Sequence, residues 1–174
     1  MFGSIFGLPL HILVIHLVVV LGPIAGFMVI AYAVRPAWRD YLTWPTLIVT
    51  TVAGLASIVA GQSGEALQHR LEQRGLGASQ LQLINSHVEA GNAAKILGVL
   101  FMVVTWAVIW LVLSPGLAAG KATHVTDPMP TRRQFSPTVR TISAVGLVVV
   151  ALAFIVAVTI AGHLGAVASW KGIF

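Results

Sequence analysis

Apolar residues fill four long stretches of this 174-residue chain, and polar residues gather between them. Each stretch reaches or exceeds the roughly 20 residues that a helix needs to cross a bilayer. The pattern predicts four transmembrane helices, at about residues 8–34, 45–74, 79–113 and 142–170. Residues 114–141, rich in proline and basic residues, are expected to form an extended cytoplasmic linker. No internal repeat is expected.

The composition favours a membrane protein. Hydrophobic residues make up 57% of the chain and charged residues 9%, whereas roughly a quarter of the residues in soluble domains are charged. A soluble fold would have too little polar surface to cover its core. We therefore expect a single all-α membrane domain over residues 1–174, a four-transmembrane-helix antiparallel bundle in contact with the lipid bilayer. The first apolar run is too long for a cleaved signal peptide and is expected to remain as a helix.

The basic residues lie mainly in two loops. The first–second and third–fourth connections contain Arg35, Arg39, Lys121, Arg132, Arg133 and Arg140, whereas the other side has Arg70, Arg74 and Lys171. Loops rich in Lys and Arg stay in the cytoplasm. We therefore expect a multi-pass protein of the inner (plasma) membrane with both termini on the outer side. The net charge of +5 is then a topology signal, and no nucleic-acid partner is expected.

Small residues recur at helical spacing in the first two apolar stretches. Such residues allow close contact between helices in a membrane. The stripe includes Gly22, Gly26, Gly54 and Gly61. These glycines could pack inside the bundle, or they could contact a membrane protein partner or a second copy of the chain.

Ionisable side chains inside a bilayer are costly and therefore indicate a candidate site. The helix order brings several of them, from all four helices, to the outer half of the bundle. The deeper ones are His16 and His163, each about 10 Å below the surface, together with Lys95. A shallower layer contains His11, Glu65, His87 and Glu89.

Two cofactors fit these residues. The chain has no cysteine, which excludes iron–sulfur clusters, thiolate zinc sites and c-type haem. His16 and His163 could be the axial ligands of a b-type haem in an electron carrier, with Lys95 near a propionate. The shallower layer could instead hold a transition-metal ion. Because His11 and His16 project about 140° apart around a helix, we expect only one of them to face the bundle.

Other classes of function have weaker support. A non-catalytic accessory subunit of a respiratory-type membrane complex would use the histidines only as hydrogen-bonding groups between helices. Hydrolases are disfavoured because the chain has no serine nucleophile elbow and no H-E-x-x-H motif. A transporter is not favoured either, because the sequence indicates no pair of broken helices. The residues do not decide whether the protein is an enzyme.

Four short segments resemble motifs of one family of bacterial membrane proteins, the domain of unknown function 2231 family. They are residues 7–11 with His16, 63–67, 86–91, and 162–166 with Trp170. The resemblance implies a four-helix membrane domain, and it adds weight to His11, His16, Glu65, His87 and His163 as a group. The chain differs at Ile12, where the family often has proline, and at Asn92, where an acidic residue is common. The family has no assigned activity, so the resemblance implies no reaction.

Overall fold

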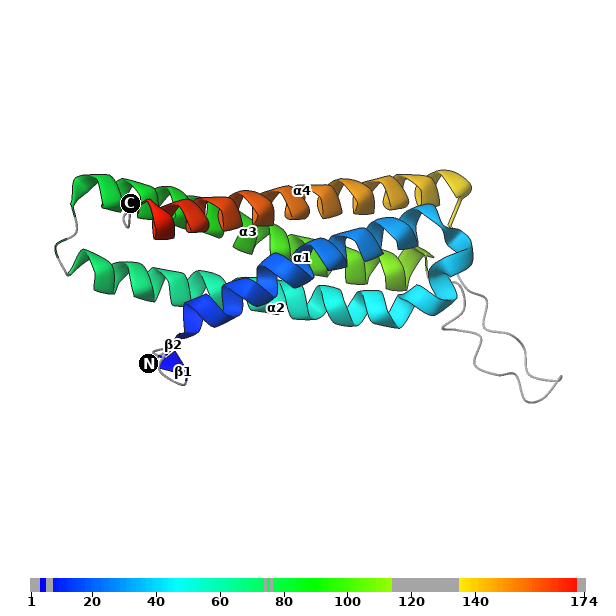
Figure 1. The fold of residues 1–174 in the computed structure, drawn as a ribbon. Coiled ribbons are helices and arrows are strands. Elements are labelled where there is room, and N and C mark those ends of the chain that lie inside the picture. Colours follow the sequence, from blue (N-terminus) through cyan, green and yellow to red (C-terminus); the bar gives the residue numbers. More distant parts are fainter. Residues whose placement is uncertain (1–3, 6–7, 74, 76, 114–134, 172–174) are drawn as a thin grey trace, which may run out of the picture.

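Four long helices lie side by side in a bundle (Figure 1). They are α1 (Leu10–Val34), α2 (Arg39–Glu72), α3 (Ala78–Val108) and α4 (Pro137–Trp170). The structure, a computed structural model, describes residues 4–5, 8–73, 75, 77–113 and 135–171. Each helix packs against the next, and α1 packs against α4.

Short elements accompany the helices. A 3-10 turn, η1 (Pro36–Trp38), joins α1 to α2, and a π-helical turn, η2 (Ile109–Leu113), follows α3. Before α1, the two-residue strands β1 (Ser4–Ile5) and β2 (Leu8–Pro9) pair in antiparallel fashion. The start of α1 and the end of α4 lie at one end of the bundle, called the terminal end below (Figure 1).

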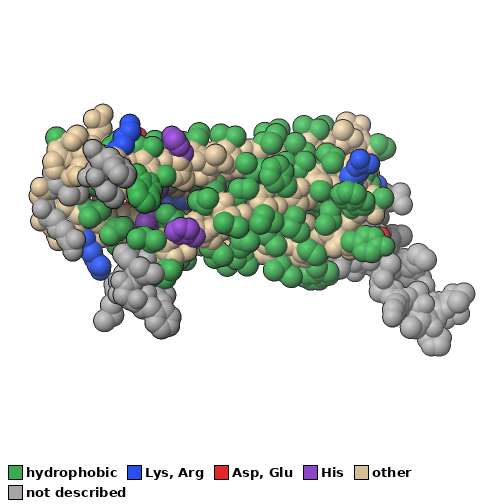
Figure 2. Space-filling model, viewed as in Figure 1, with side chains coloured by type: hydrophobic (Ala, Val, Ile, Leu, Met, Phe, Trp, Pro, Cys, Tyr) green, Lys and Arg blue, Asp and Glu red, His purple; other side chains and the backbone are tan. Residues whose placement is uncertain are grey.

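All four helices are long and apolar enough to cross a membrane, which confirms the predicted membrane-spanning helices. Their outer surface suits lipid. Phe27 and Leu111 are 63% and 66% exposed, and hydrophobic side chains cover the middle of the face that Figure 2 shows. Such a large apolar surface would be unstable in water and is stable in a bilayer. Which side of the membrane each end faces stays a prediction.

The helix boundaries differ from those predicted. α1 begins at Leu10 because Leu8 and Pro9 form β2. α2 begins at Arg39 and passes through Pro45 instead of starting there. The Arg39 guanidinium donates to the carbonyl oxygens of Tyr32 and Ala33, each at 3.1 Å. Those carbonyls belong to the last turn of α1, where they have no partner within their own helix. The contact therefore holds the α1–α2 connection at Arg39, six residues before the predicted start of α2 at Pro45.

α4 begins inside the predicted linker, at Pro137. The Ser136 hydroxyl accepts a hydrogen bond from the Val139 N–H at 3.3 Å, and proline follows at the first helical position. Both features are typical of a helix N-terminus. The rest of that linker, residues 114–134, and Arg74 lie outside the described residues.

Contrary to the expectation from the sequence, the two helical hairpins α1–α2 and α3–α4 carry one repeated pattern. Equivalent residues share their type and their place. The pairs are His11 with His87, Gly22 with Gly98, Pro36 with Pro137, Arg39 with Arg140, Ala60 with Ala161, Gly61 with Gly162, and Gly64 with Gly165. The repeat escapes notice because the insertion after α3 changes the spacing and because apolar residues vary freely between the halves.

The packing repeats with the sequence. A side chain on Gly22 would meet Val158, and one on Gly98 would meet the equivalent residue, Ser57. Likewise, Gly162 lies against Val19 where Gly61 lies against Lys95. The bundle therefore has an approximate twofold symmetry that exchanges the two hairpins.

The glycines of the small-residue stripe are used inside this bundle. Gly22 and Gly26 lie against α4, Gly54 lies against Met102 of α3, and Gly61 lies against Lys95. A Cβ on Gly26 would approach Ile155 to 2.6 Å. Of the two alternatives for these glycines, packing inside the bundle is therefore the one that the structure shows. Contact with a partner protein stays a prediction.

Candidate functional site

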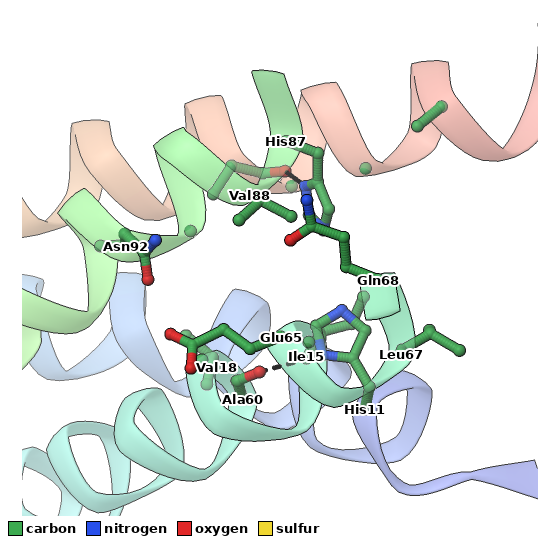
Figure 3. A pocket seen from close by; sticks show the side chains of 18 of the residues that line it. His11, Ile15, Val18, Ala60, Glu65, Leu67, Gln68, His87, Val88 and Asn92 are labelled. Carbon is green, nitrogen blue, oxygen red and sulfur yellow. Dashed lines mark hydrogen bonds between the residues drawn. The ribbon is translucent and has the colours of Figure 1, made fainter. Parts of the chain in front are cut away.

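A cavity of about 400 Å³ opens between the four helices near the terminal end (Figure 3). Every helix contributes to its lining. The ionisable residues are His11 from α1, Glu65 from α2, and His87 and Lys95 from α3. Glycines supply much of the remaining wall: Gly61, Gly64, Gly91, Gly162 and Gly165. Gly91 has open space beside it, whereas the other four glycines let side chains of neighbouring helices approach the backbone closely.

His11 is held by α2. Its Nδ1 lies 3.0 Å from the carbonyl oxygen of Ala60. A carbonyl only accepts, so Nδ1 carries the proton and donates. The ring approaches Gly64 most closely through its Cε1 atom, which would lie 2.9 Å from a Cβ on that residue. The glycine is therefore required for this position of the imidazole.

His87 repeats this arrangement in the second hairpin. Its Nδ1 donates to the carbonyl oxygen of Ala161 at 3.0 Å. A Cβ on Gly165 would come within 2.8 Å of the His87 Cε1 atom. Each hairpin therefore positions its own imidazole by the same carbonyl and the same glycine.

The two imidazoles face each other across the cavity (Figure 3). The ring centroids of His11 and His87 are 6.0 Å apart, with an interplanar angle of 69°. Since each Nδ1 donates to a carbonyl, each Nε2 has a free lone pair. Within the described chain, neither Nε2 has a hydrogen-bond partner. A metal-binding histidine usually donates its other ring N–H in this way.

The charged groups of the cavity do not follow the twofold symmetry. Lys95 of α3 donates to Glu65 of α2 at 2.8 Å. The equivalent positions are Val19 and Ala166. The α2–α3 side of the cavity is therefore charged and the α1–α4 side apolar, whereas the two imidazoles are alike.

The predicted histidine pair is not brought together in the cavity. His16 and His163 are both exposed and do not line it. The Nδ1 of His16 lies 2.5 Å from the Ile12 carbonyl oxygen of its own helix. Because His16 follows His11 by about 140° around the helix, it points outward when His11 points inward. The structure therefore gives no support to the expectation that His16 and His163 pair inside the bundle.

The predicted metal ligands are only partly assembled. His11, Glu65 and His87 line the cavity, but Glu89 is exposed and lies outside it. In the part of the chain that the structure describes, no three His, Asp or Glu side chains form a group that could hold a metal ion. An ion held by protein ligands alone is therefore not supported.

Sequence reasoning missed several components of the site. Gln68 lines the cavity and donates to Asn85 of α3 at 3.0 Å. The two carbonyl acceptors, Ala60 and Ala161, have no side-chain signal of their own. A comparison of the two halves would have found them, because Ala-Gly-x-x-Gly occurs in each.

Comparison with known proteins gives a family but no activity. No curated protein and no solved structure matches the chain. The sequence profile of a family described as predicted membrane protein (DUF2231) matches residues 7–173. This match covers all four helices and both pocket histidines, so the chain belongs to the DUF2231 family of predicted membrane proteins.

Proposed function

We propose that this cavity binds a b-type haem, with His11 and His87 as its two axial ligands. The observation that carries the proposal is the pair of facing imidazoles, each oriented by an Nδ1–H bond to a backbone carbonyl. A metal–imidazole bond is about 2.0 Å long, so two imidazoles on opposite sides of one ion have centroids roughly 6 Å apart. The ring centroids of His11 and His87 are 6.0 Å apart, which is close to this value.

A tetrapyrrole also accounts for what the cavity lacks. It brings four nitrogen ligands and needs only two from the protein, one on each face. This fits a site with two opposed imidazoles and no third ligand among the described residues. Gly91 of α3 has nothing within 4 Å of its Cβ position, and about 400 Å³ lies within the range of ordinary small-molecule pockets.

The role that follows is electron transfer. An iron with two histidine ligands has no open position for a substrate, so the bound haem would exchange electrons only. The protein contributes the two ligands, their orientation and an apolar surrounding. The Glu65–Lys95 pair adds a charged group on one side of the cavity, in reach of a ligand that carries acidic groups.

The test is the absorbance spectrum of protein purified from haem-replete cells. We expect a Soret band that sharpens and shifts on reduction with dithionite, with about one haem per chain. His11→Ala and His87→Ala should each abolish this band. The matched controls are His16→Ala and His163→Ala, which should retain it because both side chains lie outside the cavity.

Absence of a Soret band in the wild-type protein would overturn the proposal. Elemental analysis of the same sample would then detect a bound transition metal. Co-purification of a constant partner in mild detergent, without haem or metal, would favour an accessory subunit instead.

We also infer that the protein lies in the inner (plasma) membrane with both termini outside. The support is the excess of Lys and Arg in the α1–α2 and α3–α4 connections. The haem would then lie nearer the outer surface, because the cavity is close to the terminal end of the bundle.

A further inference from the structure

Three threonine hydroxyls are buried far from the cavity without a partner. Thr46 and Thr50 of α2 and Thr105 of α3 are 0% exposed. Among the residues that the structure describes, none of their Oγ1 atoms has a hydrogen-bond partner. A buried hydroxyl without a partner is destabilising, and buried polar groups that lack a protein partner usually bind ordered water.

Other hydroxyls of α2 behave differently. Thr43, Thr51 and Ser57 each donate to the carbonyl oxygen four residues earlier, at 2.6, 2.7 and 2.8 Å. This bond is the usual way to satisfy a hydroxyl within a helix. Thr46 and Thr50 lie on the same helix and do not make it. Because both residues are also 0% exposed, their oxygens lie in the interior of the bundle.

The three hydroxyls lie at neighbouring levels of adjacent helices. Trp106 of α3 donates to the Thr51 hydroxyl at 2.8 Å, and Thr50 and Thr105 immediately precede these two residues. Thr46 is one turn away along α2. Thr50 is about 16 Å from Arg39 along the helix axis, which places the group within the apolar part of the bundle.

The repeat supplies an internal comparison. The positions equivalent to Thr46, Thr50 and Thr105 are Leu147, Ala151 and Val29, and all three are completely buried and apolar. The equivalent helices α1 and α4 therefore have no hydroxyl at these three positions. On the α2–α3 side, three hydroxyls are retained at a cost that the equivalent positions avoid.

The same one-sided polarity continues toward the cavity. Ser57 corresponds to Val158, and the Glu65–Lys95 pair corresponds to Ala166 and Val19. Every one of these polar residues lies on α2 or α3. Between the two polar sections, Phe101 and Phe154 stack with centroids 5.0 Å apart, so the threonine group is separate from the cavity.

We propose that Thr46, Thr50 and Thr105 form a binding site for internal water in the half of the bundle away from the terminal end. A buried water needs about two to four polar partners, and three hydroxyls supply them. This site gives the α2–α3 side a hydrated position inside the membrane. It does not depend on whether the cavity binds haem.

The sign of a stability change tests this proposal. Thr105→Val and Thr50→Val remove one hydroxyl at nearly constant shape in the full-length protein. If the hydroxyl holds water, we expect each variant to unfold at a lower denaturant midpoint than the wild type. Thr159→Val is the control, because that exposed hydroxyl bonds its own helix, and its midpoint should stay unchanged. An equal or higher midpoint for both buried variants would overturn the proposal.

A second measurement works even if a variant fails to fold. Infrared spectra of the wild-type protein in detergent should show a sharp internal-water O–H band that shifts in H₂¹⁸O. The band should weaken in Thr105→Val and remain in Thr159→Val. A wild-type spectrum without any ¹⁸O-sensitive internal band would overturn the proposal.

Discussion

At the scale of single residues, the position of each pocket imidazole depends on one backbone carbonyl and on one glycine. His11 uses Ala60 and Gly64, and His87 uses the equivalent residues of the second hairpin. The side-chain type alone does not distinguish these histidines from His16 and His163. The two pairs differ in the residue that each ring contacts. The glycines therefore identify the inward-facing histidines as clearly as the histidines themselves do.

Replacing either of these glycines should disturb the proposed haem site. In Gly64→Ala, the new Cβ would lie 2.9 Å from the His11 ring, so the imidazole must move away from its carbonyl. We expect the haem content per chain to fall by at least half, measured by the pyridine haemochrome assay. Gly146→Ala is the control, since nothing lies within 4 Å of a Cβ there. Full haem content in Gly64→Ala would contradict this account.

The Glu65–Lys95 pair should show measurable coupling between its two members. In Glu65→Ala, the Lys95 ammonium loses its 2.8 Å partner, which should lower the unfolding free energy by about 0.5–1 kcal/mol, because Glu65 is exposed and exposed ion pairs are weak. The double variant Glu65→Ala with Lys95→Val copies the residues of the other hairpin, Ala166 and Val19, and should recover most of the loss. Additive losses in equilibrium unfolding would show that the pair is not coupled.

At the scale of the elements, glycines set how closely the helices approach. The bulky residue and the glycine exchange helices between the halves: Gly26 of α1 meets Ile155 of α4, whereas Met102 of α3 meets Gly54 of α2. Each interface thus pairs one large side chain with a glycine. This complementarity fixes the rotation of α1 and α3 about their axes, and so decides which histidines face inward.

Enlarging Gly26 should therefore weaken the α1–α4 interface. Its Cβ would come within 2.6 Å of Ile155, so Gly26→Ala should lower the unfolding free energy by about 1–3 kcal/mol through overpacking. Shortening the opposing residue, in Gly26→Ala with Ile155→Val, should recover part of it. Size-exclusion chromatography should show the same oligomeric state for all three proteins. A changed state would mean that Gly26 also contacts another chain.

The N-terminus of α4 depends on a single cap. Ser136 accepts from the Val139 N–H, and Ser136→Ala should cost about 1 kcal/mol, measured by equilibrium unfolding. Ser136→Asp keeps an acceptor and should retain the stability. An unchanged stability in Ser136→Ala would show that the cap does not contribute.

At the scale of the whole molecule, the site forms only where the two hairpins meet. Each hairpin orients its histidine with its own carbonyl, His11 with Ala60 and His87 with Ala161. Neither hairpin contains two opposed ligands. The twofold symmetry therefore matches a ligand with two equivalent faces, while the Glu65–Lys95 pair distinguishes its two sides.

Splitting the chain in the α2–α3 turn tests this division. Residues 1–75 or 76–174 expressed alone should not retain haem, because each provides one axial ligand. Co-expressed in one cell, the two halves should assemble and restore the Soret band. Haem retained by one half alone would contradict a site shared between the hairpins.

The orientation in the membrane can be tested by single cysteines, since the sequence has none of its own. Gln73→Cys lies in the α2–α3 turn, and Thr138→Cys lies at the start of α4, at the other end of the bundle. We expect a membrane-impermeant maleimide to label the first variant in intact cells and the second only after lysis. The reverse pattern would place both termini inside.

The sequence alone determined the four membrane-spanning helices, because the length and apolarity of a run are local properties and they decide whether a helix can cross the bilayer. It also indicated His11, Glu65, His87 and Lys95, because ionisable residues are rare in such runs. Only the tertiary structure decided which imidazoles meet. That choice depends on the rotation of each helix, set by contacts such as Gly26 with Ile155 between residues far apart in the chain. The repeat, too, became clear only from those contacts, because the insertion after α3 changes the spacing between equivalent residues.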